Sequence, residues 1–278
     1  RNRDEVQYGA ITSLTYHPTI NWLEDFSFET GFDFEQQENK YLQFRTDNGI
    51  ARTPARFANI RNDEKWNFLI YGGYVQAVIK PTKWLKITPG YRADQVDGNF
   101  SNFRPTVSGD FPVNDYGTIS QPKIGAVITP VEGYSLYGNW GRTFQIGVGS
   151  ATFRNLNAAN VKPSINEGWE VGFKLNPVDW AEARVAYWVQ DATNELSRNL
   201  ASAESTSVGA TKRQGVDIEA KISPVERVSI WAAYSLQEAV VKKAPPFVQF
   251  ASEYAVGNQI VNTHNNLFTD GIDYQVTP

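Results

Sequence analysis

The chain has 278 residues with no Cys, no Met and two His, which excludes a disulfide framework, a thiolate metal site and a His-rich metal centre. Its formal net charge of −4 lacks the basic excess of a nucleic-acid binder, so we expect no nucleic acid among its partners. A mean hydropathy of −0.42 without a long apolar run excludes a helical membrane protein, although 13% of the residues are aromatic.

Strands with one apolar and one polar face are predicted along the chain, because apolar and polar side chains alternate with a period of two. The clear cases are 26–34, 84–94, 170–175, 184–190, 216–222 and 228–237. We assign to the apolar face Phe26, Phe28, Phe34, Tyr187 and Tyr234, and to the polar face Asp33, Arg92, Trp188, Trp231 and Gln237. Strands with one lipid-facing side would make a polar chain rich in aromatic residues.

Short turns that contain proline separate pairs of predicted strands. The prolines are Pro18, Pro81, Pro130, Pro177, Pro224 and Pro278, which lie 47 to 63 residues apart. Between successive prolines two strands are joined by a longer polar loop, at 36–65, 98–120, 145–164, 192–212 and 240–262. The sequence is therefore an internal repeat of strand, long loop, strand and tight turn.

Short turns at one end and long loops at the other are typical of barrels of the outer-membrane type. We therefore predict an all-β fold, a transmembrane antiparallel up-and-down β-barrel, to which this chain contributes about 11 strands of about 10 to 14 residues each. The alternative is a large soluble β-barrel or sandwich. Because the sequence starts with Arg1 rather than Met, we expect a processed or partial chain.

Four segments resemble motifs of the TonB-dependent outer-membrane receptors, in the order and spacing of that family. They are 121–125 (QPKIG), 134–144 (YSLYGNWGRTF), 162–174 (KPSINEGWEVGFK) and 212–219 (KRQGVDIE). The resemblance implies a barrel of about 22 strands with a plugged lumen, in which residues 1–278 would form part of a single transmembrane domain. The plug domain, the TonB box and the closing strands would lie outside this chain. A half barrel would leave two open edges in lipid, so the functional unit would be the complete barrel.

The resemblance also implies a location in the bacterial outer membrane and a monomeric barrel in contact with outer-membrane lipid and lipopolysaccharide. Arg142 is a candidate contact for a lipopolysaccharide phosphate. The other partners would be the inner-membrane TonB complex, reached through the plug, and a small-molecule metal chelate.

The implied function is active import of a scarce nutrient, with a ferric siderophore as the first candidate. A corrinoid, haem, another metal complex or an organic cofactor remain alternative cargoes. Passive diffusion through a porin and a docking role for phage or toxins also remain open.

Candidate ligand-binding residues are the arginines and aromatic residues of the predicted loops, because guanidinium groups bind anions and rings cover the apolar parts of a chelate. They are Tyr41, Phe44, Arg45, Arg52, Arg56, Phe57 and Arg61 in the first loop, and Phe103, Arg104, Tyr116, Phe153, Arg154 and Arg198 in later loops. Arg92 and Trp188 are candidates on the inner wall. The alternative roles are solvation or lipopolysaccharide contact for the loop residues, and plug contact for the wall residues.

Catalytic residues are not predicted. Asp191 and Glu195 lie at a strand–loop junction without an organised partner, and the stretch from Gly209 to Gly215 lacks the spacing of a phosphate loop. We therefore expect no enzyme activity and no cofactor or metal bound directly by protein ligands. Iron would arrive only inside its chelator.

Overall fold

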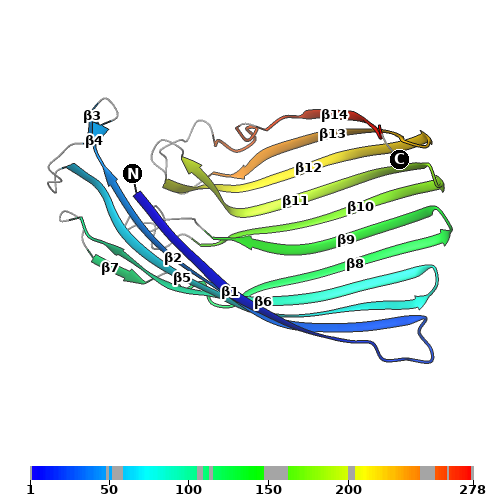
Figure 1. Cartoon of the computed structure of the whole chain (residues 1–278), viewed down its shortest axis with the longest axis horizontal. Helices are drawn as coiled ribbons and strands as arrows, with labels where there is room; N and C mark the ends of the chain where they lie inside the picture. The colour runs from blue at the N-terminus through cyan, green and yellow to red at the C-terminus, as the bar shows by residue number, and fades with distance from the viewer. Residues whose placement is uncertain are drawn as a thin grey trace.

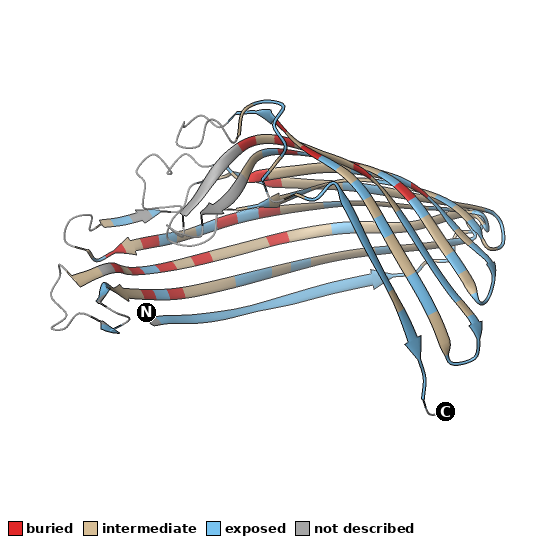
Figure 2. Ribbon diagram, turned by 90° about the horizontal axis from the view of Figure 1, so that it is seen from above, coloured by how far each residue is buried: buried red, intermediate tan, exposed pale blue. Residues whose placement is uncertain are grey.

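The computed structural model describes residues 2–47, 50–51, 59–104, 109–112, 115–146, 162–199, 204–244, 254–261 and 263–276. They form one large antiparallel sheet, which is bent into a trough (Figures 1 and 2). Its main strands are β1 (Asn2–Tyr16), β2 (Asp25–Phe44), β5 (Ile60–Thr82), β6 (Leu85–Asn102), β8 (Ile119–Val131), β9 (Tyr134–Gln145), β10 (Ser164–Val178), β11 (Ala181–Asn199), β12 (Glu204–Val225), β13 (Val228–Lys243) and β14 (Asn266–Tyr274).

The topology is a plain meander, because each main strand pairs with the main strand that follows it in the chain. A short strand β7 (Gly109–Pro112) adds to β6, and β3 (Thr46–Asp47) pairs with β4 (Ile50–Ala51) in a separate hairpin. Within the described ranges, the all-β, up-and-down architecture and the 11 main strands agree with the sequence prediction. No helix in those ranges is long and apolar enough to cross a membrane.

Several predicted loop boundaries and strand lengths were wrong, although β9 ends at Gln145 and β10 begins at Ser164, as the predicted loop 145–164 requires. Most of the predicted loop 36–65 is strand, since β2 runs to Phe44 and β5 begins at Ile60, and β11 and β12 extend through most of 192–212. The main strands have 9 to 23 residues, and only β8 and β9, with 13 and 12, fall within the predicted 10 to 14. The ladder is held by backbone hydrogen bonds, which continue beyond the part of each strand where side chains alternate regularly.

The proline turns have a common construction at four places. The register of the pairing shifts just before the turn, for example between Ile128 and Val131 at the β8–β9 turn, and Pro130 lies in the gap. Proline has no backbone N–H to donate to a ladder, so an irregular position suits it. The residue before this proline, Thr129, donates its N–H to the carbonyl of Trp84 in the preceding turn, at 2.7 Å. Neighbouring turns are thereby linked.

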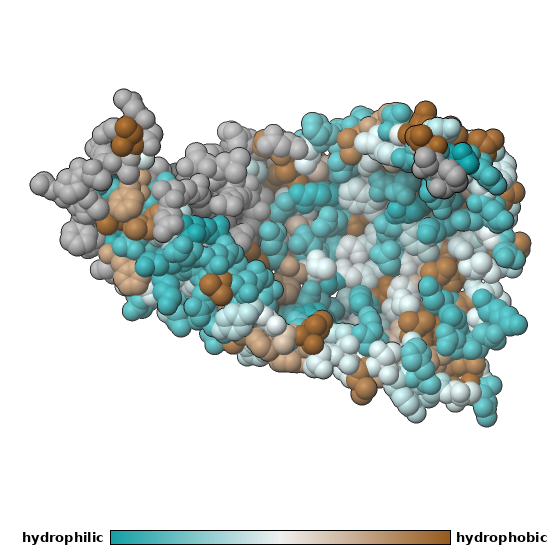
Figure 3. Space-filling view, in the orientation of Figure 1, coloured by the Kyte–Doolittle hydropathy of each residue, from teal (hydrophilic) through white to brown (hydrophobic). Residues whose placement is uncertain are grey.

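The pairing register confirms the predicted two faces of the sheet. On one face, apolar side chains of six successive strands stand directly opposite one another: Leu136, Phe173, Val185, Ile218, Tyr234 and Phe268. These six are 38% to 62% exposed. The other face, hereafter the polar face, carries Asp33, Arg92, Trp188, Trp231 and Gln237, and hydrophilic side chains gather in the hollowed middle of the molecule (Figure 3).

The main buried core lies at the end of the sheet where the longer connections are. It consists of Tyr41, Trp66, Phe68, Val96, Phe100 and Ile119, and we call it the loop-end cluster. Phe100 is completely buried. This cluster lies on β2, β5, β6 and β8, so it anchors the long-strand part of the sheet.

Candidate functional site

Arginine side chains on the polar face form networks of ion pairs and hydrogen bonds that span several strands. Arg92 on β6 binds Asp33 on β2 through two hydrogen bonds of 2.6 and 2.7 Å, and binds Asp94 at 2.6 Å. The Asp94 carboxylate is 2% exposed, and Gln121 on β8 donates to it as well. Because both carboxylates engage one guanidinium, this network has an excess of one negative charge.

A second network connects β9, β10, β11 and β12. Arg184 donates to Glu170 at 3.0 Å, to Glu219 at 3.0 Å and to the Tyr137 hydroxyl at 2.7 Å. Tyr137 donates to Glu170 at 2.5 Å, so the phenol is held between the guanidinium and the carboxylate. Here too one arginine is paired with two carboxylates, which uses most of its donors.

Two smaller networks also lie on the polar face. Glu29 accepts hydrogen bonds from Tyr74 at 2.6 Å and from Gln76 at 2.8 Å, and Lys123 extends this group by donating to Gln76 at 3.0 Å. Nearer the loop end, Arg213 pairs with Glu195 at 2.5 Å. Such cross-strand polar contacts tie neighbouring strands together on a face that would otherwise only be solvated.

Large side chains of the polar face lie over glycines of the adjacent strand. Trp188 stands directly opposite Gly215, and a Cβ on this glycine would come within 2.8 Å of the indole. Trp231 has the same relation to Gly271, with 2.7 Å to the indole. The glycines leave room for the rings to lie flat along the wall, which is a close-packing use of glycine in a strand.

Most of the predicted ligand-binding residues that the structure describes lie at the loop end, whereas two of them lie elsewhere on the wall. Tyr41 is part of the buried loop-end cluster, and its hydroxyl donates to Gln43 at 2.9 Å. Tyr116 is half-buried against the same cluster. Arg92 and Trp188 lie further along the polar face, where Arg92 is held in its ion pairs and Trp188 lies over Gly215.

The remaining described candidates are at the loop end. Phe44 is half-buried at the end of β2, and Arg45 is exposed, with its backbone N–H bonded to the Asn59 carbonyl at 2.7 Å. Phe103 is 53% exposed, and the backbone N–H of Arg104 bonds to Asn102 at 3.0 Å. The backbones of Arg61 and Arg198 lie in β5 and β11, whereas Arg52, Arg56, Phe57, Phe153 and Arg154 lie outside the described residues.

Sequence reasoning missed the aromatic side chains that form the centre of the loop end. Trp66 and Phe68 are buried and sit directly opposite Asn39 and Gln37, and Phe100, which was placed in a loop, stands opposite Trp66. A signal was present, because Trp66 and Phe68 share the parity of the polar-face residues further along β5. It was overlooked because Trp66 and Phe68 lie just beyond the predicted loop 36–65, in a stretch that was not among the clear cases of alternation.

The surroundings of this cluster are rich in buried amides and carboxylates. Asn39, Asn62, Glu64, Asp94 and Asn102 are each at most 6% exposed. Asn62 donates to Gln43 at 2.8 Å. Where side chains are described, the loop end therefore consists mainly of buried aromatic rings and amide groups, and the guanidinium groups lie at its margin. Among the described residues, no three His, Asp or Glu side chains are arranged to hold a metal ion.

Solved structures of metal transporters and of a siderophore receptor share this arrangement of strands. The ferric citrate transporter FecA in its unliganded form matches with a TM-score of 0.77 and 16% identity, over 98% of this chain and 40% of that one. The siderophore receptor PiuA from Acinetobacter baumannii matches with a TM-score of 0.78 and 16% identity, over 99% of this chain and 44% of that one. The copper transporter OprC matches with a TM-score of 0.64 and 15% identity, over 86% of this chain and 38% of that one.

At such identities the likeness is one of fold. This chain spans about two fifths of the length of the first two transporters named. The family model described as "TonB dependent receptor-like, beta-barrel" matches residues 2–278, and the chain therefore belongs to that family of TonB-dependent receptor barrels.

Proposed function

We propose that this chain forms about half of the barrel wall of a receptor that imports an iron chelate of the siderophore type across the bacterial outer membrane, with energy supplied through TonB. The observation that carries the proposal is the family match over residues 2–278, combined with the fold likeness to transporters of ferric citrate and siderophores. The closing strands and a plug in the lumen would belong to the rest of the longer protein.

The exposed apolar face supports a position in the membrane. Contiguous apolar surface of this extent is uncommon on soluble proteins. On β10, outward-facing residues from Trp169 to Pro177 span about 27 Å along the strand, which a tilt of about 40° reduces to about 21 Å across the bilayer. That height is close to the apolar band of about 25 Å on outer-membrane barrels. The rings of Trp169 and Tyr187 pack edge to face at one end of the band, with their centroids 5.5 Å apart, as in an aromatic girdle.

The loop end is the side where we expect cargo to enter. Exposed Arg45 and Phe103 and half-buried Arg104 stand beside the loop-end cluster, so they could contact an anionic chelate whose apolar parts rest on rings. The metal would stay in its own chelator, and the protein would recognise the shape and charge of the complex. The barrel wall itself would carry out no chemistry.

A second cargo class has a specific observation in its favour. The copper transporter OprC shares the fold, so a complex of another metal is a direct competitor of the iron chelate. Corrinoids, haem and organic cofactors use the same mechanism in this proposal. A porin mechanism would need no energy coupling, and a toxin-docking role would add to import, as one structural relative was solved in complex with pyocin S2.

The test is uptake by cells that depend on the full-length receptor. We expect radiolabelled ferric siderophores of the hydroxamate, catecholate and carboxylate classes to include one whose uptake requires both this receptor and TonB. Uptake that persists in a strain without TonB would contradict active import and support passive diffusion. Failure of every iron complex, with success of a copper, corrinoid or haem cargo, would replace the siderophore with that cargo.

A further inference from the structure

One acidic side chain stands on the apolar face of the sheet, on the edge strand β14. Asp270 lies between Phe268 and Ile272 on that face, because side chains two residues apart along a strand point to the same side. It stands directly opposite Ala232 of β13, and its side chain is exposed. A carboxylate is therefore part of the surface that the proposed function places in lipid.

A hydrogen bond that recurs at the short-turn end fixes the depth of Asp270 in this surface. On β8, β10, β12 and β14 one backbone N–H bonds to a carbonyl of the preceding short turn, at 2.6 to 2.9 Å. The donors are Thr129, Asn176, Ser223 and Gln275. The residues five positions before them are Ile124, Val171, Ile218 and Asp270. Because the first three are exposed apolar residues, Asp270 lies at the level of the apolar band.

A charge at this depth is unfavourable unless the protein supplies a partner. Charged residues on the lipid face destabilise a membrane barrel, and most strongly near the middle of the bilayer. Asp270 makes no ion pair and no side-chain hydrogen bond within the described part of the chain. Its partner therefore has to come from another part of the complete protein.

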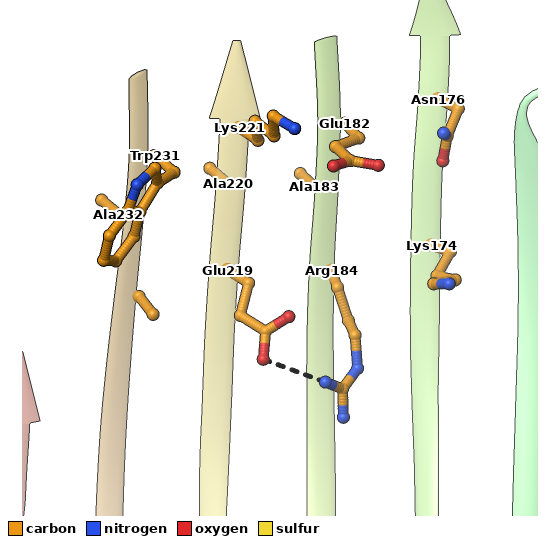
Figure 4. A pocket seen from close by; sticks show the side chains of 11 residues that line it. Lys174, Asn176, Glu182, Ala183, Arg184, Glu219, Ala220, Lys221, Trp231 and Ala232 are labelled. Atoms are coloured by element: carbon orange, nitrogen blue, oxygen red, sulfur yellow. Dashed lines mark hydrogen bonds and ion pairs between the residues drawn. The ribbon is translucent and has the colours of Figure 1, made fainter. Parts of the chain in front are cut away.

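The neighbouring strand β13 offers no donor to this carboxylate. Ala232, directly opposite, continues into a row of alanines with Ala220 on β12 and Ala183 on β11 (Figure 4). The diagonal neighbour Tyr234 already donates its hydroxyl to Asn266, at 2.5 Å. The opposite edge of β14 is unpaired in the described sheet. Protein donors can therefore reach Asp270 only from that free edge.

We propose that the strand which pairs with the free edge of β14 in the complete barrel carries a Lys or Arg on its lipid-facing side, directly opposite Asp270. Directly opposite side chains of antiparallel strands have Cβ atoms about 4.5–5.5 Å apart, which allows an ion pair. The pair neutralises the carboxylate in apolar surroundings. It also fixes the register at this seam, because a slip of one residue turns the cation to the other face. The inference rests on the proposed function, because it takes the apolar face to lie in lipid.

Replacement of Asp270 by Leu distinguishes a paired from an unpaired carboxylate by the sign of its effect. In the purified full-length receptor in lipid vesicles, Asp270→Leu should lower the urea midpoint of unfolding by about 1 M or more, because the cation is left without its partner. A carboxylate without a partner predicts a higher midpoint for the same variant, since a charge is removed from lipid. A higher or unchanged midpoint would overturn the ion pair.

The matched control places a carboxylate at the same level without a partner. Ile218 stands between Val185 and Tyr234 on the apolar face, so no cation is opposite it. Ile218→Asp should lower the urea midpoint in the same vesicles. An unchanged midpoint would show that the wall tolerates an unpaired carboxylate at this depth, which would remove the reason for a partner.

A double substitution then identifies the partner. Oxidative cross-linking of Asp270→Cys with single cysteines along the adjoining strand locates the opposite residue, with any native Cys outside this chain replaced by Ser; this chain has none. We expect Lys or Arg there. Its replacement by Leu together with Asp270→Leu should restore the parent midpoint, even where the single variant fails to insert. An apolar residue at that position, or no recovery in the double variant, would overturn the proposal.

These results are separate from the uptake assay. Uptake that persists without TonB contradicts active import, whatever the unfolding results are. Uptake that depends on TonB, together with a higher midpoint for Asp270→Leu, contradicts the ion pair alone.

Discussion

Arg92 binds Asp33 although the two residues are on strands that are not neighbours. Arg92 is on β6 and Asp33 on β2, with β5 between them, yet Nη1 and Nη2 reach the two carboxylate oxygens at 2.6 and 2.7 Å. Gly72 of β5 stands directly opposite both Asp33 and Asp94. A glycine there leaves the space through which the guanidinium crosses, so one ion-pair network ties three strands together.

We expect Arg92→Met to lower the free energy of unfolding by about 2–4 kcal/mol, because Asp94, which is 2% exposed, would keep a charge without its cation. The measurement is urea unfolding of the full-length receptor in lipid vesicles. The matched control is Arg142→Met, whose ion pair with Glu167 is 37% and 42% exposed and should contribute less than about 1 kcal/mol. Equal effects of the two substitutions would contradict a special role for the Arg92 network.

The neighbouring glycines Gly72 and Gly73 provide a second test. A Cβ at Gly72 would overlap the Asp94 carboxylate and come within 2.8 Å of Arg92, whereas at Gly73 the nearest heavy atom is 3.6 Å away. Gly72→Ala should therefore destabilise the receptor by about 1–3 kcal/mol through overpacking. Gly73→Ala should be nearly neutral. Thermal unfolding of both variants checks the expectation, and a larger loss with Gly73→Ala would refute the crossing described for Arg92.

The assignment of the two faces predicts how the wall tolerates a charge. Val185 lies in the middle of the exposed apolar row, so Val185→Lys should reduce the free energy of insertion into vesicles by about 2–4 kcal/mol. Asn139→Lys puts the same side chain on the polar face, opposite Glu170, and should change stability by less than about 0.5 kcal/mol. Similar losses at both positions would argue against a lipid-facing apolar side.

Substitutions of Phe100 and Phe103 can distinguish a packing role from a binding role at the loop end. Phe100 is completely buried in the loop-end cluster, so Phe100→Ala should cost about 3–5 kcal/mol of stability. Phe103 is 53% exposed, and Phe103→Ala should leave unfolding within about 0.5 kcal/mol of the parent. If Phe103 contacts cargo, its variant should weaken binding in a titration with the imported chelate. Normal affinity in a folded Phe103→Ala receptor would remove it from the binding surface.

Much of the fold was predictable because it depends on local rules. A period of two in side-chain polarity identifies the faces of a strand, and the opposite faces assigned to Phe28 and Asp33 agree with the pairing register. The repeated proline turns indicated how many strands to expect. The ends of the strands were not predictable, since Tyr41 and Glu64 pair across β2 and β5 in a stretch whose side chains resemble a loop.

The sequence by itself determined the class of wall, its two faces and its repeat, because each of these follows from the order of side chains along one strand or one turn. Only the tertiary structure decided what those side chains meet. It paired Arg92 with two carboxylates and buried Tyr41 and Phe100. These outcomes depend on the register between strands and on glycines across the ladder, which alternation along a single strand does not specify.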